Sequence, residues 1–402
     1  MKFKILYILF IIICVLYPYK LIIGPISIRH IMSLTMLIVS LYEGFRSDKY
    51  LYLYYIFLFC LLFSSLVTGY IGIFANKLLG TYMPIVAAYA ATYILINKYR
   101  GTNVLLWLFI AIGLLDAVVT IGQFFHLAYV DTIFNLFRFD YNEEFFDLSG
   151  RRQSLEGFAI PGLLDTVTNG YFLSAIAIMV LYNQKCNFII NIVLWLVVMV
   201  ASLLTQERTG FFLALIFSAY IICKYFFSKG RAVGYIFTGI SVIVISYVLF
   251  DYLGLLFDSD LRFAKGFETD SRDEMRANAW RYLLSNPFGG AYDFDAAGNR
   301  APHNFFVNSF LYGGVVGGVC IIVLLFLQIK KIFPYLFKKA NTENAQWAFI
   351  FGLMYIDYSL NSMLHNASII HGTFMFFVWW GAFLGFAYLD KKEVNRIKSN
   401  KL

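Results

Sequence analysis

A segment that begins at Ser271 combines arginines with a histidine, and it holds the residue types best suited to chemistry. It reads SRDEMRANAWRYLLSNPFGGAYDFDAAGNRAPHNFFVNSFLYGGVVGG. His303 stands between Pro302 and an apolar run, at the end of a long polar loop. Because an imidazole titrates near neutral pH, His303 could act as a general base that takes a proton from an attacking hydroxyl. An interfacial histidine that only caps the following helix would have the same spacing.

Three arginines could bind an anionic group. Arg272 and Arg276 are four residues apart, so they project from one face of a helix. Arg208 stands in the short connection TQERTG between two apolar runs, where an arginine more often faces a polar cavity than lipid. Guanidinium groups bind phosphate oxygens bidentately and stay charged, and in a partly desolvated site they would stabilise a departing diphosphate. The alternative is that these charges are simply tolerated where they lie.

The segment around these residues predicts a helix, a turn and a second helix. Ser271 and Glu274 fit a capping box, and the helix that they start should stop before Pro287. The letters NPFGG predict a turn that brings the chain back toward His303. Asn304 could orient the imidazole, bind a substrate hydroxyl, or cap the next helix.

No pattern of metal ligands accompanies these residues. The five cysteines are scattered, without a CxxC pair or a His/Cys cluster of zinc spacing. The acidic residues of the loop match no known metal-loop spacing, and we interpret them as arginine partners or solvated charge. They are Asp270, Asp273, Glu274, Asp293 and Asp295. We therefore expect no metal site and no cofactor.

Two features of the apolar runs have more than one interpretation. Asp116 lies near the middle of one run, where a carboxylate could couple transport to an ion or could form a structural hydrogen bond. The glycines of GGVVGG repeat at 313/317 and 314/318, and this small-xxx-small pattern predicts close helix packing. Only the first feature would favour a transporter.

The composition places these residues in a membrane protein. With 60% hydrophobic and 14% charged residues, the chain is far more apolar than a soluble domain. A bilayer core about 30 Å thick needs about 20 apolar residues per helix. Runs of about that length stand at 3–23, 26–44, 50–74, 78–97, 103–128, 162–182, 187–205, 209–227, 232–250, 304–327, 344–362 and 368–389.

The distribution of positive charge predicts the orientation. More than half of the 32 lysines and arginines fall in segments on the side of the N-terminus, so we expect both termini to be cytoplasmic. The predicted fold is all-α, a polytopic membrane bundle of about 12 transmembrane helices with a large extracytoplasmic loop between helices 9 and 10. Residues 1–250 would hold helices 1–9 and an outer loop at about 129–161, residues 251–303 the large loop, and residues 304–402 helices 10–12 and a basic cytoplasmic tail.

The order of these motifs resembles the O-antigen ligase and O-antigen polymerase superfamily of bacterial membrane glycosyltransferases. One likeness is SRDEMRANAWRYLLSNPFGG, in which Arg272 leads into a helix and then a proline-apolar-glycine turn. A second is His303 and Asn304 followed by Gly314 and Gly317, and a third is the arginine turn TQERTG. Twelve runs with the large loop between the ninth and tenth are also typical of this family.

The resemblance implies a metal-independent transfer of a glycan from a polyprenyl diphosphate donor to an acceptor hydroxyl, outside the plasma membrane. His303 would then be the base, and Arg208 and Arg272 would hold the diphosphate. The family usually has a tryptophan four residues after the loop arginine, where this chain has Arg276 and places Trp280 one turn later. Which of Arg272 and Arg276 binds the diphosphate is therefore open.

We accordingly expect a multi-pass protein of the bacterial plasma (inner) membrane that polymerises polyprenyl-diphosphate-linked oligosaccharide repeat units of a surface polysaccharide (O-antigen, capsule or exopolysaccharide). Its partners would be the lipid-linked donor, a glycan acceptor and the lipid bilayer, with a chain-length regulator left open and no nucleic acid. Alternatives are an O-antigen ligase that moves finished glycan to lipid A-core, a transporter or flippase of the lipid-linked oligosaccharide, and a non-catalytic assembly subunit. Polar residues that cluster at one face favour chemistry over transport.

Overall fold

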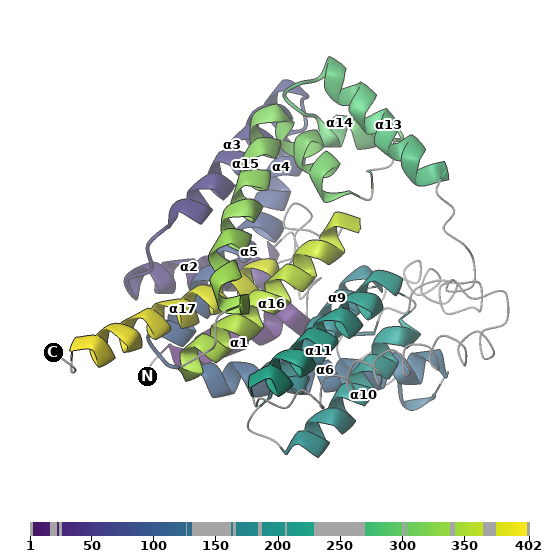
Figure 1. Cartoon of the computed structure of the whole chain (residues 1–402). Coiled ribbons are helices and arrows are strands. Elements are labelled where there is room, and N and C mark those ends of the chain that lie inside the picture. The colour runs from purple at the N-terminus through teal and green to yellow at the C-terminus, as the bar shows by residue number, and fades with distance from the viewer. Residues whose placement is uncertain are drawn as a thin grey trace. The chain divides into compact units, whose positions relative to one another are not determined.

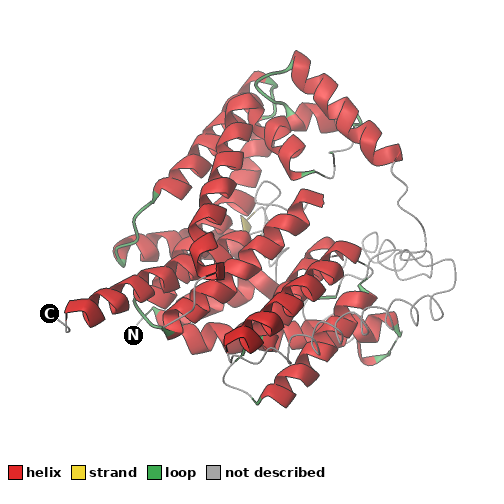
Figure 2. Ribbon diagram, viewed as in Figure 1, coloured by secondary structure: helices red, strands yellow, loops and turns green. Residues whose placement is uncertain are grey.

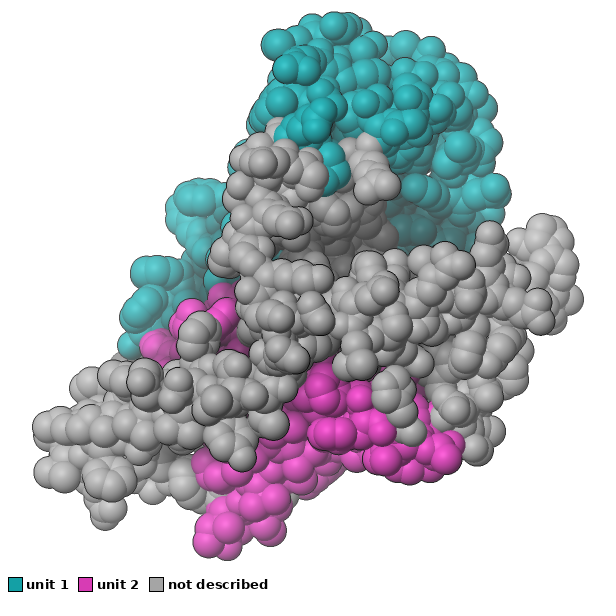
Figure 3. All heavy atoms as spheres, turned by 90° about the vertical axis from the view of Figure 1, so that its right-hand side faces the viewer, with its two compact units in different colours: residues 1–102, 269–402 teal, residues 103–268 magenta. Residues whose placement is uncertain are grey.

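The computed structural model is helical almost throughout its described part, with one pair of two-residue strands (Figure 2). It describes residues 3–16, 22–23, 26–125, 127–130, 162–163, 166–183, 187–205, 207–228, 270–299, 302, 304–337, 342–364 and 375–399. The chain divides into two compact units, residues 1–102 with 269–402 and residues 103–268, which are coloured separately in Figure 3.

The first unit contains the short strands and most of the helices (Figure 1). Its elements are α1 (Lys4–Leu16), β1 (Ile22–Ile23), β2 (Ile26–Ser27), α2 (Ile28–Tyr42), α3 (Lys49–Val67), α4 (Ile71–Lys77), the π-helix η1 (Leu78–Tyr82), α5 (Met83–Asn97), α13 (Asp270–Ser285), α14 (Ala291–Ala296), α15 (Phe305–Phe337), α16 (Glu343–Leu364) and α17 (Met375–Ser399). The strands β1 and β2 pair antiparallel, with Ile22 opposite Ser27.

The helices of the second unit are α6 (Thr102–Phe124), whose first residue still belongs to the first unit, α9 (Thr166–Leu181), α10 (Phe188–Leu204) and α11 (Arg208–Ser228). Asp116 on α6 accepts a hydrogen bond from the backbone N–H of Leu163 at 2.7 Å. Gln123, two turns further on, accepts from the N–H of Gly162 at 3.0 Å and donates to its carbonyl at 3.3 Å. The buried carboxylate therefore helps to hold the turn before α9, which is the structural one of its two predicted roles.

Four helical stretches are long and apolar enough to cross a membrane, and several shorter apolar helices accompany them. The four are Lys49–Val67, Ile71–Asn97, Asn103–Phe124 and Phe305–Phe337. Apolar side chains also remain exposed at helical spacing along the outside of the first unit. On α3 they are Tyr52, Tyr55, Phe59, Phe63 and Leu66, and on α15 they are Val315, Val319, Val323 and Phe326. Such continuous apolar stripes fit an all-helical membrane bundle, in which lipid covers them.

Each predicted run that falls on described residues overlaps a helix, whereas the run at 232–250 lies outside the described part. The predicted boundary between the third and fourth runs, at 75–77, is wrong. The chain instead turns at Thr68–Tyr70, where Gly69 has a φ of +81°, and α4, η1 and α5 then continue without a break to Asn97. Lys77 therefore lies on a helix and not in a loop.

The core of the first unit is a cluster of aromatic rings between α3, α5, α16 and α17. Trp380 is fully buried, and its ring centroid lies 4.8 Å from that of Tyr50, 5.4 Å from that of Tyr355 and 5.2 Å from that of Phe383. Rings at these separations add specific edge and stacking contacts to the area that they bury. The cluster fixes the ends of α3 and α17 against each other.

Small residues let α15 approach α3 closely, as the glycine pattern predicts. A Cβ on Gly313 would lie 2.8 Å from the Phe57 ring, and a Cβ on Gly317 would lie 3.1 Å from the Cβ of Cys60. A further member of the pattern, Gly314, has a different role, because α15 is not one straight helix.

Candidate functional site

A break in α15 defines the region where the predicted site residues of the first unit meet. Gly314 has φ +63° and ψ −167°, which is not helical, so the predicted run at 304–327 consists of two helices and not one. In an unbroken helix the carbonyl of Leu311 would accept from the N–H of Val315. Here the Leu311 carbonyl accepts from the N–H of Gly290 at 2.9 Å, and the Val315 N–H donates to the carbonyl of Pro287 at 3.0 Å. The predicted NPFGG turn therefore supplies the hydrogen bonds that the broken helix lacks.

Two glycines make this backbone contact possible. A Cβ on Gly314 would lie 2.5 Å from the carbonyl carbon of Phe288, and a Cβ on Gly289 would lie 2.7 Å from the backbone nitrogen of Gly314. Gly289 also has a positive φ of +85°. Because real Cβ atoms do not come this close to backbone, neither position accepts another residue without moving the turn away from α15.

The helix α13 carries the loop arginines and is attached at this break. Its bounds confirm the helix predicted from Ser271, and it ends before Pro287 as expected. Arg272 and Arg276 are one turn apart on it; the side chain of Arg272 lies outside the described part, and Arg276 is half-buried. Trp280 packs on Phe310 of α15, with ring centroids 5.9 Å apart. Figure 1 shows α13 and α14 gathered at the same end of α15.

The segment that precedes α15 is fixed on both sides of His303, which itself lies outside the described residues. The side chain of Asn304 accepts from the N–H of Val307 at 3.0 Å, which is the capping role among its three predicted roles. Asn308 donates to the carbonyl of Pro302 at 2.7 Å, and the Asn304 N–H donates to the same carbonyl at 2.8 Å. These bonds hold the backbone at Pro302 and Asn304.

Arg208 belongs to the second unit, where it is the first residue of α11. Its side chain lies outside the described part. The neighbouring Glu207 is buried, and its backbone N–H donates to Thr205 at 3.1 Å. The predicted meeting of Arg208 with α13 and His303 in one pocket thus stays a prediction.

Lys77, a lysine between two apolar runs, lies close to this end of α15. The ammonium of Lys77 is 4.8 Å from the ring centroid of Tyr292 and 5.8 Å from that of Tyr312, within cation–π range. Desolvation raises the pKa of Asp295, and the charge of Lys77 partly offsets that rise. The signal that could have found Lys77 is a charged residue inside a long apolar run, which usually faces a polar interior.

The two loop helices are also joined to each other. The Tyr282 hydroxyl on α13 donates to Asp293 on α14 at 2.8 Å. Burial and the bonded carboxylate both raise the pKa of Tyr282, so the phenol keeps its proton and remains a donor. Together with Arg276 and Lys77, these groups form a polar rim at this end of α15. The rim consists of α13, the turn at 286–290, α14, Pro302, residues 304–314 and Lys77.

The rim offers cationic and phenolic groups of the kind that bind anionic oxygens. Among the residues that the structure describes, no group of three or more His, Cys, Asp or Glu side chains could hold a metal ion. Comparison with protein-family models, with characterised proteins and with solved structures finds no match to this chain. The fold and the rim define a class: a helical protein with membrane-length apolar helices and a polar end that carries arginine, lysine and tyrosine side chains.

Proposed function

We propose that the protein is a membrane glycosyltransferase that polymerises polyprenyl-diphosphate-linked oligosaccharide repeat units on the extracytoplasmic side of the bacterial plasma membrane. One observation carries the proposal. The turn that directly follows the arginine helix α13 is joined through two backbone hydrogen bonds to α15, the helix that follows His303 and Asn304 in the sequence. Residues suited to binding a diphosphate thereby lie on a helix attached to the one that follows His303 in the sequence.

The position of the rim supports the proposed side of the membrane. On α3, Phe63 contacts Phe288 of the rim, with ring centroids 5.5 Å apart, while Lys49 starts the same helix. The rise of a helix puts these ends roughly 20 Å apart. Segments proposed to be cytoplasmic, including Lys49 and Lys331 of α15, thus lie at the opposite ends of their helices from the rim. The total of twelve spans and the cytoplasmic termini are part of the proposal.

In the proposed reaction, an acceptor hydroxyl attacks the anomeric carbon of the donor sugar. The hydroxyl proton passes to the imidazole of His303, the new glycosidic bond forms, and the bond from the anomeric carbon to the diphosphate oxygen breaks. The polyprenyl diphosphate leaves with the electron pair of that bond. Arg276, with Arg272 and Arg208, would bind its oxygens and stabilise the charge that develops.

The test uses the purified full chain in lipid nanodiscs with a defined polyprenyl-diphosphate repeat unit. A ladder of products without a second acceptor supports the polymerase. A single adduct that forms only with added lipid A-core supports the alternative ligase. If neither product forms, and the protein in sealed vesicles moves the lipid-linked sugar across the membrane, the protein is a transporter and the proposal is overturned.

Substitutions on α13 provide a matched comparison of arginines. Arg276→Lys keeps the charge but removes the fork, and we expect a tenfold or larger loss of polymer, since one charge-assisted hydrogen bond contributes roughly 1.5–3 kcal/mol. Arg281→Lys on the same helix is the control, because Arg281 is exposed and donates to Asn278 at 3.1 Å. His303→Ala should abolish the product at a normal protein level. Full activity of both Arg276→Lys and His303→Ala would refute the assignment.

A further inference from the structure

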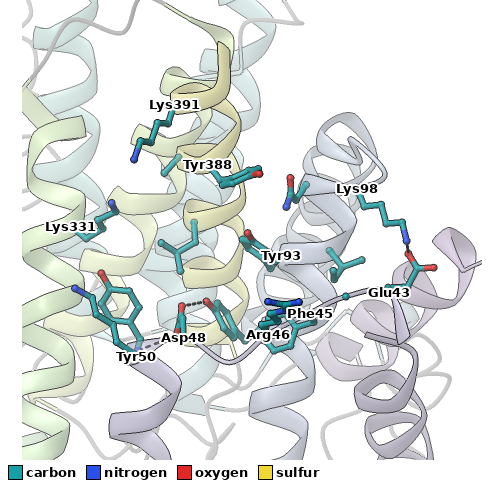
Figure 4. A pocket seen from close by; sticks show the side chains of 17 residues that line it. Glu43, Phe45, Arg46, Asp48, Tyr50, Tyr93, Lys98, Lys331, Tyr388 and Lys391 are labelled. Carbon is teal, nitrogen blue, oxygen red and sulfur yellow. Dashed lines mark hydrogen bonds and ion pairs between the residues drawn. The ribbon is translucent and has the colours of Figure 1, made fainter. Parts of the chain in front are cut away.

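A second polar region lies at the other end of α3 and α15 from the rim. It is a cavity of about 810 Å³ between the loop at 43–50, the end of α5, the later part of α15 and the end of α17, and it is called the basic pocket below (Figure 4). Its cationic lining residues are Arg46, Lys49, Lys98, Lys331 and Lys391, and its acidic ones are Glu43 and Asp48. Cations therefore exceed carboxylates in the lining.

Both acids of the basic pocket are already engaged. Glu43 pairs with Lys98 and accepts from the Tyr99 hydroxyl at 3.1 Å. One oxygen of Asp48 accepts from two backbone N–H groups in the first turn of α3, each at 3.0 Å. The other accepts from the Tyr89 hydroxyl at 2.5 Å. These bonds leave the carboxylates little capacity to neutralise the remaining lysines and arginine.

Four cations converge on the pocket from different parts of the chain without such a pairing. Arg46 and Lys49 come from the loop before α3 and its first residue, Lys331 from α15 and Lys391 from α17. For none of the four is a carboxylate found at ion-pair distance within the described part of the chain. Figure 4 shows Lys331 and Lys391 on one side of the pocket and the Lys98–Glu43 pair on the other. All four residues are exposed, and gathered like charges attract an anion that would offset their repulsion.

We propose that the basic pocket binds the phosphate-bearing headgroup of an anionic phospholipid, independently of the proposed glycosyl transfer. Basic pockets between membrane helices are suited to such headgroups. The pocket stands where α3 begins, and the exposed apolar stripe of that helix starts at Tyr52, one turn after Lys49. A lipid whose phosphate lies among the cations could therefore place its acyl chains along α3.

Tyrosines suit the pocket to phosphate esters. Tyr50, Tyr93 and Tyr388 line the cavity beside the cations. Phenol rings at the membrane interface pack against glycerol and acyl groups while their hydroxyls stay in the polar layer. A soluble phosphate compound would use the same cations but would gain nothing from the exposed apolar stripe. The lipid is therefore the occupant to which the proposal commits.

The test measures lipid binding to the full chain by native mass spectrometry from a mild detergent. Phosphatidylglycerol and phosphatidylcholine are titrated separately, and inorganic phosphate is then added as a competitor. The informative variant is Lys331→Gln with Lys391→Gln. Its matched control is Lys330→Gln with Lys392→Gln, which removes the same charge from exposed neighbours that do not line the pocket.

We expect phosphatidylglycerol to bind wild type and control equally, and the informative variant roughly 30-fold more weakly, since each lysine contributes about 1 kcal/mol. Lys331→Arg with Lys391→Arg should keep the affinity, which separates loss of charge from misfolding. The proposal fails if both glutamine pairs weaken binding alike, or if phosphatidylcholine binds as tightly as phosphatidylglycerol. It also fails if millimolar inorganic phosphate binds through the same two lysines while phosphatidylglycerol does not.

Discussion

Substitution of Gly314 by alanine tests the attachment of the loop to α15 most directly. A methyl group there would lie 2.5 Å from the carbonyl carbon of Phe288 and 2.7 Å from the carbonyl oxygen of Pro287, which are backbone atoms that cannot rotate away. The turn must therefore separate from α15. Its two interhelical hydrogen bonds, Gly290 to Leu311 and Val315 to Pro287, would then be lost.

The loss of stability expected for Gly314→Ala has two parts of similar size. The backbone angles of Gly314 are accessible almost only to glycine, and forcing alanine into them costs roughly 2 kcal/mol. The two hydrogen bonds contribute about 1 kcal/mol each. We therefore expect Gly314→Ala to lower the free energy of unfolding by about 4 kcal/mol.

Gly298→Ala is the matched control. Gly298 has a similar positive φ of +80°, but no atom lies within 4 Å of the position that its Cβ would take. Gly298→Ala should lower the free energy of unfolding only by the cost of the backbone angles, roughly 1–2 kcal/mol. Unfolding of the detergent-solubilised protein measures the free energies, and hydrogen–deuterium exchange reports the local effect. The amides of Gly290 and Val315 should exchange at least tenfold faster in Gly314→Ala and unchanged in Gly298→Ala. Equal destabilisation by the two substitutions, with unchanged exchange at both amides, would refute the reasoning.

Three further substitutions have defined outcomes. Asp116→Asn keeps an acceptor for the N–H of Leu163 and should change stability little, whereas Asp116→Ala leaves that buried N–H unpaired and should cost about 2 kcal/mol in thermal unfolding. Equal losses of stability in Asp116→Asn and Asp116→Ala would exclude a stabilising hydrogen bond from Leu163 to Asp116. Tyr355→Phe removes the donor to the buried Gln328 and should cost about 1–2 kcal/mol, and adding Gln328→Leu should recover part of the loss in a double-mutant cycle. Asp295→Asn should raise the melting temperature at pH 7, because the raised pKa of Asp295 means that its ionisation disfavours the folded state as pH rises above 3.8. That gain should disappear below this pH, and a gain independent of pH would contradict the charge effect.

Much of the helical structure follows from local properties of the sequence. The long apolar runs predict the helices of the first unit, and Ser271 with Pro287 predicts both ends of α13 to within about two residues. The predicted turn at NPFGG and the capping role of Asn304 also depend on neighbours in sequence. Each of these features is decided within one or two turns of chain, where residue preferences are informative.

The sequence predictions fail where contacts between distant parts of the chain determine the structure. The turn at Gly69 joins two runs that are equally apolar, so hydropathy cannot locate it. GGVVGG predicts close packing, and Gly317 behaves so, but the break at Gly314 depends on hydrogen bonds offered by Pro287 and Gly290. The basic pocket needs Arg46 and Lys391, which only the fold brings together. No local pattern contains that information.

The exchange of hydrogen bonds at Gly314 sets rules for building chimeric proteins. The predicted membrane border lies near residue 303, and a loop swap would ordinarily be cut there. In a recipient helix without a break like that at Gly314, the carbonyl and the N–H at the positions of Leu311 and Val315 would stay paired with each other, and the transplanted residues 287–290 would find no partners. A transplanted loop should therefore carry the first helix of α15 with it, and its downstream junction should fall after Val315.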